Sequence, residues 1–193
     1  MSFITSKNNV GQCMSLIQSL KARDPDAFSH VFETHADKIY RLALRILHDE
    51  QQADGVVQNT FLKLIEHIES FEERANLSTW LYRVAYNECM QRIRRAKPEI
   101  NIDENLMPTH FIDWDTIPDA VFSSQETQAQ IQRAIETLPH TLKTVFILRD
   151  IEELSTAQTA QILGISESAV KVRLHRARLM LRERLATYFE DYV

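Results

Sequence analysis

The chain has 193 residues and a formal net charge of −5 at pH 7; 44% of its residues are hydrophobic and 25% are charged. With only three glycines and five prolines, it is poorly suited to β architectures with many turns, and an all-α fold is expected. No apolar run approaches the roughly 18 residues of a membrane span, and the first residues do not form a cleavable signal sequence, so we expect a cytoplasmic protein without membrane insertion.

Residues 1–97 are predicted to form a compact helical bundle. After a short polar leader, apolar side chains recur with helical period, and the last helix of this domain is expected over about 78–95. Asp24 followed by Pro25 is a typical helix start, because the Asp side chain can accept a bond from a free N–H group and proline has no N–H to leave unpaired.

One helix of this bundle includes the stretch DGVVQNTFLKLI, residues 54–65. Its helical spacing leaves Leu62 exposed beside Gln58. A lone exposed leucine is ordinary, but one that lies among Asp54, Gln58 and Asn59 also fits a surface on which another helix docks. The residues of this helix expected to face the core are Val57, Phe61, Leu64 and Ile68.

The end of the first domain combines aromatic and basic residues. Rings stack on unpaired bases while arginines hold the backbone, so this combination suits single-stranded nucleic acid. The segment 71–77 is the better candidate to meet an unstacked base, whereas Trp80 is as consistent with core packing as with stacking. The members are Phe71, Trp80, Tyr82 and Tyr86 with Arg83, Arg92, Arg94, Arg95 and Lys97, opposed only by Glu88.

Residues 98–125 are predicted to be an acidic linker. Between Lys97 and Arg133 the chain has no Lys or Arg, but it has seven Asp or Glu residues and three prolines. Since these seven negative charges exceed the net charge of −5 in magnitude, the two flanking domains together carry about +2. The acid is segregated in the linker, and the folded domains are mildly basic.

Residues 126–193 are predicted to form a helix-turn-helix domain. Ser155 and Gln158 fit a capping box at the start of a short helix, and Gly164 can take the left-handed conformation that ends it. Ser166 can then cap a longer helix. A short helix, a glycine turn and a basic helix form the pattern in which the second helix enters the DNA major groove.

The last helix holds five Lys or Arg residues and no acid between Glu167 and Glu183. A narrow apolar stripe for packing on the domain consists of Val170, Leu174, Ala177 and Leu181. The residues expected to reach base edges are Ser168, Lys171, Val172, His175 and Arg176, and those expected at phosphates are Arg173, Arg178 and Arg182. A surface helix with solvated arginines is the alternative; the caps, the glycine and the stripe together favour DNA binding.

Three segments resemble the extracytoplasmic-function class of bacterial sigma factors. They read DPDAFSHVFETHADKIYRLALRILHDEQQADGVVQNTFLKLI, STWLYRVAYNECMQRIRR and VFILRDIEELSTAQTAQILGISESAVKVRLHRARLMLRERL. The resemblance covers roughly residues 12–188 and both domains in order. It implies a bundle like sigma region 2 and a helix-turn-helix domain like region 4, in a protein that directs core RNA polymerase to specific promoters, assists promoter melting and is controlled by an anti-sigma factor in a stress or envelope response.

The resemblance also implies contacts for each part of the chain. The acidic linker would thread toward the RNA exit path, and the second domain would meet the polymerase flap and the minus-thirty-five element. The clamp helices of the polymerase would be bound by Asp54, Gln58, Asn59 and Leu62. An unpaired base of the minus-ten element would be captured by the 71–77 loop and the following helix, through Phe71, Trp80, Asn87, Arg92 and Arg95.

Two positions depart from the usual pattern of the family. Gly55 stands where an acid is common, and a glycine inside a helix costs about 1 kcal/mol relative to alanine, which weakens the expected docking surface. Val172 replaces a frequent small polar residue, and its methyl groups favour contact with a thymine methyl over a hydrogen bond.

Two other classes of function remain as alternatives. A free-standing helix-turn-helix regulator would need a dimer interface or a ligand-sensing domain, and no long heptad run is present. An enzyme is not expected, because the sequence has no P-loop, zinc-hydrolase or nucleophile-elbow motif. Cys13 and Cys89 lie far apart without a Cys-x-x-Cys pattern, so we expect no disulfide, no metal and no cofactor.

Overall fold

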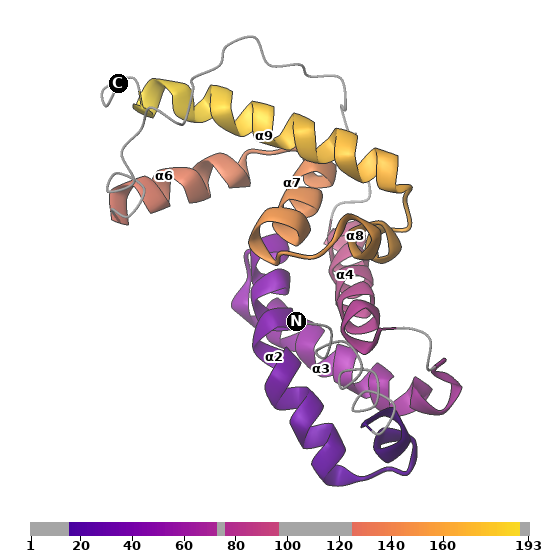
Figure 1. The fold of residues 1–193 in the computed structure, drawn as a ribbon. Coiled ribbons are helices and arrows are strands. Elements are labelled where there is room, and N and C mark those ends of the chain that lie inside the picture. The colour runs from indigo at the N-terminus through magenta and orange to yellow at the C-terminus, as the bar shows by residue number, and fades with distance from the viewer. Residues whose placement is uncertain (1–15, 73–75, 97–124, 190–193) are drawn as a thin grey trace, which may run out of the picture. The chain divides into compact units, whose positions relative to one another are not determined.

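The computed structural model describes residues 16–72, 76–96 and 125–189, which are drawn as coloured ribbons in Figure 1. The chain divides into two compact units, residues 1–98 and 99–193, and each is described by itself. Within the described residues all regular structure is helical, so the prediction of an all-α fold is confirmed. The predicted acidic linker, 98–125, lies outside the described residues except for Gln125.

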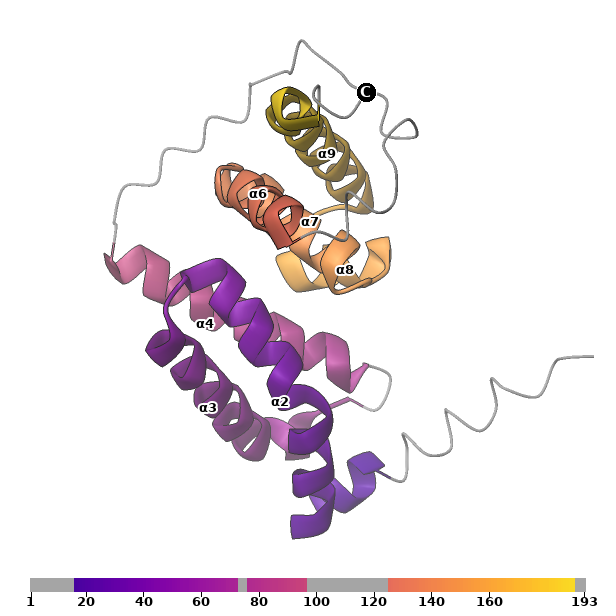
Figure 2. The same cartoon turned by 90° about the vertical axis from the view of Figure 1, so that its left-hand side faces the viewer.

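The first unit is a bundle of long helices. Figure 2 shows α2, α3 and α4 packed along one another. The elements are helical residues 16–21, α2 (Pro25–Leu47), α3 (Glu50–His67), the short 3-10 helix η1 (Ile68–Ser70) and α4 (Leu77–Ala96). The largest fully buried side chains of this unit are Leu20, Val31, Ile39, Leu42, Val56, Leu64, Ile68 and Leu81.

The ends of α2 and α3 are fixed by local side-chain chemistry. The Asp24 carboxylate accepts a hydrogen bond from the Asp26 N–H at 3.0 Å, and Pro25 occupies the first turn, as the sequence predicts. His48 ends α2 in the left-handed conformation with φ 55°. Asp49 follows directly and caps α3 through the Gln52 N–H at 2.9 Å. The connection between the two helices is therefore short and well defined.

The buried face of α3 differs from the prediction at one residue. Phe61 was expected in the core, but its ring is only partly buried and lies against Phe32 of α2, with 4.8 Å between ring centroids. Ala53, Val56 and Thr60 are fully buried instead. Because α3 packs against both α2 and α4, its buried face is wide and shifted away from Phe61.

The second unit is built around the last helix. Its elements are α6 (Gln125–Glu136), α7 (His140–Phe146), the π-helical turn η3 (Ile147–Ile151), α8 (Thr156–Leu163) and α9 (Glu167–Phe189). One buried cluster joins α6, α7 and α9 through Ala134, Ile135, Leu138, Leu142, Ala177, Met180, Leu181 and Leu185. A second joins α7, α8 and α9 through Val145, Ala160, Val170 and Leu174.

The predicted helix caps of this unit are confirmed. The Ser155 Oγ accepts from the Gln158 N–H at 3.1 Å and the Gln158 Oε1 accepts from the Ser155 N–H at 2.9 Å, which is a complete capping box. Gly164 ends α8 with φ 67°, a conformation that costs glycine little. Ser166 then accepts a hydrogen bond from the Ala169 N–H at 3.2 Å, at the start of α9.

Candidate nucleic-acid interface

The helix α9 has two distinct faces. The predicted apolar stripe is buried in full, since Val170, Leu174, Ala177 and Leu181 all lie inside the core. On the remaining surface Val172 is 50% exposed, the largest exposed apolar side chain of the described second unit. Exposed beside it are Ser168, Lys171, His175 and Arg178, while Arg173 and Arg176 are half-buried. The face predicted to meet DNA is therefore accessible.

Arg178 of that face forms an ion pair within the unit. The Arg178 Nε and Nη2 donate to the two carboxylate oxygens of Asp150 in η3, at 2.8 Å and 2.7 Å. The hydrogen bonds to Asp150 raise the pKa of Arg178 above its ordinary value. The predicted phosphate contact of Arg178 therefore competes with this ion pair, a restraint that the sequence pattern does not reveal.

Phe71, the first residue of the 71–77 segment, forms an aromatic pair with Trp80. Phe71, predicted to meet an unpaired base, is instead a core residue that is only 7% exposed. Its ring packs edge-to-face against Trp80, with 6.0 Å between centroids and planes at 88°. Trp80 remains half-buried. Phe71 therefore supports Trp80 from within, and Trp80 keeps some surface for a contact.

The helix α4 separates the predicted minus-ten residues into two groups. Asn87 and Arg95 are exposed. Arg92, also predicted as a DNA contact, is half-buried. Its guanidinium packs against α3, where a Cβ on Gly55 would lie 2.7 Å from the Arg92 Nη2. The Arg92 Nε is buried without a hydrogen-bond partner among the described residues. The sequence pattern places Arg92 in the basic stretch, but it does not show that Arg92 packs against Gly55 of α3.

The residues of the docking surface predicted on α3 do not all lie on the same face of the helix. Asp54, Gln58 and Leu62 are exposed at intervals of four residues, and Leu62 is 55% exposed. Asn59, predicted on the same surface, is half-buried, and its Nδ2 donates to the Glu88 Oε2 of α4 at 3.1 Å. Helical spacing explains the difference, because a residue one position away points about 100° around the axis.

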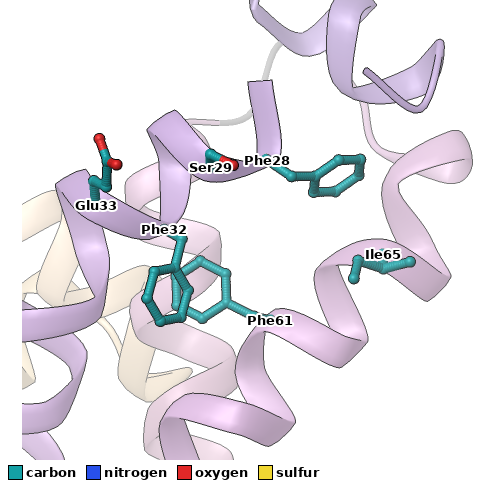
Figure 3. Close-up of a pocket in the computed structure, with 6 residues that line it drawn as sticks. All are labelled: Phe28, Ser29, Phe32, Glu33, Phe61 and Ile65. Carbon is teal, nitrogen blue, oxygen red and sulfur yellow. The ribbon is translucent and has the colours of Figure 1, made fainter. Parts of the chain in front are cut away.

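An apolar groove next to this line was missed by the sequence reasoning. It has a volume of about 340 Å³ and is lined by Phe28, Ser29, Phe32, Glu33, Phe61 and Ile65. Figure 3 shows Phe28 and Ile65 across from the paired rings of Phe32 and Phe61, with the Glu33 carboxylate pointing away. The spacing of Phe28 and Phe32, four residues apart on α2, indicates an apolar face, but the sequence pattern does not show that α3 lies opposite it.

Neither a metal site nor a membrane span is found in the described part of the chain. No group of three or more His, Cys, Asp or Glu residues there could hold a metal ion. None of its helices is both long and apolar enough to cross a bilayer. Cys89 is fully buried.

Family models match both units of the chain. Residues 31–99 match Sigma-70 region 2, and residues 128–181 match Sigma-70, region 4. The chain is 35% identical over 176 residues to the ECF RNA polymerase sigma factor SigW of Bacillus subtilis, covering 88% of this chain and 94% of SigW. It is 34% identical over 167 residues to the ECF RNA polymerase sigma factor SigM of Mycobacterium tuberculosis, covering 86% of this chain and 81% of SigM.

A solved structure supports the same fold. The chain is similar to the sigma factor RpoE of Bartonella quintana, whose structure contains the anti-sigma factor NepR, with a TM-score of 0.63 and 24% identity. The match covers 82% of this chain and 96% of RpoE.

Proposed function

Because the chain belongs to the extracytoplasmic-function class of RNA polymerase sigma factors, we propose that it directs core RNA polymerase to specific promoters and assists promoter melting. The observation that carries this proposal is the two-sided character of α9, together with family matches to both units. A promoter is then contacted at two places, one for each unit.

The second unit is assigned to the minus-thirty-five element. Lys171 and Arg176 are suited to guanine edges, and Val172 to the methyl group of thymine. Arg173 lies at the flank, where phosphates pass. The exposure of Lys171, Val172 and His175 supports this assignment. The α9 residues assigned to the element are Ser168, Lys171, Val172, Arg173, His175 and Arg176, together with Arg178, whose phosphate contact is weakened by its ion pair with Asp150.

The first unit is assigned to the unpaired minus-ten strand. Trp80 offers a partly exposed ring for stacking, and Asn87 offers an amide for a base edge. Arg95 is exposed near the end of the same helix and can reach the backbone. Phe71 and Arg92 support this surface from within the fold, according to their burial and packing.

Core polymerase is assigned to the exposed side of α3. Asp54, Gln58 and Leu62 form the line for the clamp helices, and the groove at Phe32 and Ile65 adds apolar surface beside it. The region 4 unit is expected to meet the flap. The acidic linker is expected to occupy a basic channel toward the RNA exit path.

Regulation by an anti-sigma factor is part of the proposal. The Bartonella relative of similar fold was solved in complex with an anti-sigma factor. The exposed apolar side chains of Leu62 and Phe32 offer a surface to which such an inhibitor could bind. The chain is expected to act in the cytoplasm and to have no catalytic activity of its own. Pull-downs that recover polymerase under all growth conditions, but never an inhibitor, would contradict this regulation.

The test is run-off transcription with core polymerase across a genomic promoter pool, with and without the chain. A defined set of promoters should be transcribed only when the chain is present. If no template gains transcription, the proposal is wrong. Mobility shifts separate the alternative, because strong specific binding by the isolated chain would favour a free-standing regulator.

A further inference from the structure

Two helices of the first unit are joined by a line of polar and steric contacts, here called the seam, which consists of Gly55, Asn59 and Lys63 of α3 and Glu88 and Arg92 of α4. We propose that Glu88 is a positioning residue, which fixes α4 on α3 so that the strand-binding residues of α4 are correctly placed when α3 is docked on polymerase. This inference rests on the proposed function, because its readout is promoter opening.

The centre of the seam is a buried carboxylate with two donors. The Glu88 Oε1 lies 2.5 Å from the Lys63 Nζ, and the Glu88 Oε2 accepts from the Asn59 Nδ2 at 3.1 Å. The Glu88 side chain is only 8% exposed. Both oxygens are thus occupied by groups from the facing helix.

The spacing of these residues makes the contacts specific for one register. Gly55, Asn59 and Lys63 follow one another at intervals of four on α3, and Glu88 and Arg92 are four apart on α4, so each set lies along one helix face. A slip of one turn would take Glu88 away from at least one of its two donors and leave an oxygen of the buried carboxylate without its partner, which is unfavourable.

Electrostatics support an ionised Glu88 in this position. Burial alone would raise the pKa of Glu88, but the hydrogen bonds from Lys63 and Asn59 and the charges of Lys63 and Arg92 outweigh it. The pKa of Glu88 therefore lies below its ordinary value. The carboxylate keeps its charge at neutral pH, and with it the attraction to Lys63.

The second fixed point of the seam is steric. The Arg92 guanidinium occupies the space that a side chain at position 55 would need, with Nη2 and Nη1 at 2.7 Å and 3.2 Å from an added Cβ. Arg92 lies four residues from Glu88, about 6 Å along the axis of α4. Two contacts one turn apart resist both sliding and rotation of α4 on α3.

The seam separates two surfaces that must act together. Asp54, Gln58 and Leu62 are exposed on α3, and Asn87 and Arg95 are exposed on α4. Loss of the seam leaves the α3 line in place but lets α4 move relative to it. Docking on polymerase should then persist while strand capture fails.

The experiment uses the full chain with Glu88→Gln, which keeps the side-chain shape and an oxygen acceptor for Asn59 but removes the charge facing Lys63. Affinity for core polymerase is measured by competition with labelled wild-type chain, and promoter opening by the fluorescence of a base analogue in the minus-ten region. We expect core affinity within about twofold of wild type and opening slowed by about tenfold, as for loss of a hydrogen bond to a charged group.

Two further variants make the result decisive. Lys63→Met removes the partner charge at similar length, and its combination with Glu88→Gln should slow opening no more than the worse single variant, because both remove one interaction. Asp37→Asn, an exposed carboxylate on α2, is the matched control and should behave as wild type.

Equal losses of core affinity and opening in Glu88→Gln, after correction for the folded fraction, would show a general structural role and overturn the inference. Unchanged opening would also overturn it. If Glu88→Gln does not fold, the same two measurements on Lys63→Met decide. Failure of the wild-type chain to activate any promoter would instead refute the proposed function.

Discussion

Arg178 of α9 and Asp150 of the π-helical turn form a two-pronged ion pair, with N···O distances of 2.8 Å and 2.7 Å. The Arg178 side chain is 53% exposed, so the pair contributes at most about 1 kcal/mol to the free energy of unfolding. Its greater effect concerns DNA, because a cation already paired with a carboxylate releases few counterions when it approaches a phosphate.

The first prediction follows from this pair. Asp150→Asn should strengthen holoenzyme binding to all promoter fragments and steepen the salt dependence by up to about 0.9 in log–log slope, the value for one additional phosphate contact. The measurement is fluorescence anisotropy between low and moderate salt. Adding Arg178→Ala to Asp150→Asn should restore the wild-type slope. If Arg178→Ala alone lowers the slope by the full amount, the ion pair is broken in the complex.

The second prediction concerns Val172. Its exposed methyl groups cannot hydrogen-bond, and thymine alone offers a methyl group in the major groove of unmodified DNA. Replacing one thymine of the minus-thirty-five element by deoxyuridine should weaken holoenzyme binding by about fourfold, as for one buried methylene. Val172→Ala should weaken binding to the thymine template and lose the preference for thymine over uracil. Equal binding of all thymine and uracil templates would refute this contact.

The third prediction concerns Leu62. Since the side chain is 55% exposed, Leu62→Asp should change the free energy of unfolding by no more than about 0.5 kcal/mol. Its affinity for core polymerase should fall by at least about tenfold, because a charge replaces an apolar contact. Urea unfolding and competition for polymerase measure the two quantities. A folded variant with unchanged affinity for core polymerase would show that the docking surface does not include Leu62.

The fourth prediction concerns Gly55 inside α3. Alanine there gains about 1 kcal/mol of helix propensity, but its Cβ would lie 2.7 Å from the Arg92 Nη2. The guanidinium must shift, so Gly55→Ala should stabilise the chain by less than that amount. In an Arg92→Met background the full gain should appear. A double-mutant cycle in urea measures the coupling, and additivity within error would show that the two residues do not interact.

The fifth prediction concerns Cys89. Burial raises the pKa of its thiol to about 12, so the thiolate that reacts with alkylating agents is nearly absent at pH 8. In a Cys13→Ser variant, iodoacetamide should modify native Cys89 slower than urea-unfolded Cys89 by on the order of a hundredfold or more. Rapid modification of the folded chain would place Cys89 at the surface.

The sequence predicted the features of the fold that depend on neighbours in the chain. The capping box at Ser155, the left-handed Gly164 and the Asp24 cap are local arrangements of a few residues, and each is present. The buried stripe of α9 was also predicted, because α6, α7 and α8 all pack on the same side of that helix.

Three predicted site residues have surroundings that the sequence pattern does not indicate, and in each case the cause is a contact between residues far apart in the chain. Asn59 and Arg92 are predicted at binding surfaces, and the structure shows that they also contact Glu88 and Gly55 of the facing helix, respectively. Phe71 was assigned to DNA, but it packs under Trp80. Helical periodicity gives the direction of a side chain, and it does not give the identity of what lies opposite.

The two faces of α9 share no residue: the stripe through Val170 and Leu174 belongs to the core, while Lys171, Val172 and His175 lie on the solvent side. Substitutions on the solvent side leave the packing of the domain intact. If the solvent side reads the promoter as proposed, promoter preference could be redesigned in the laboratory to give mutually independent transcription circuits without a matching loss of fold stability.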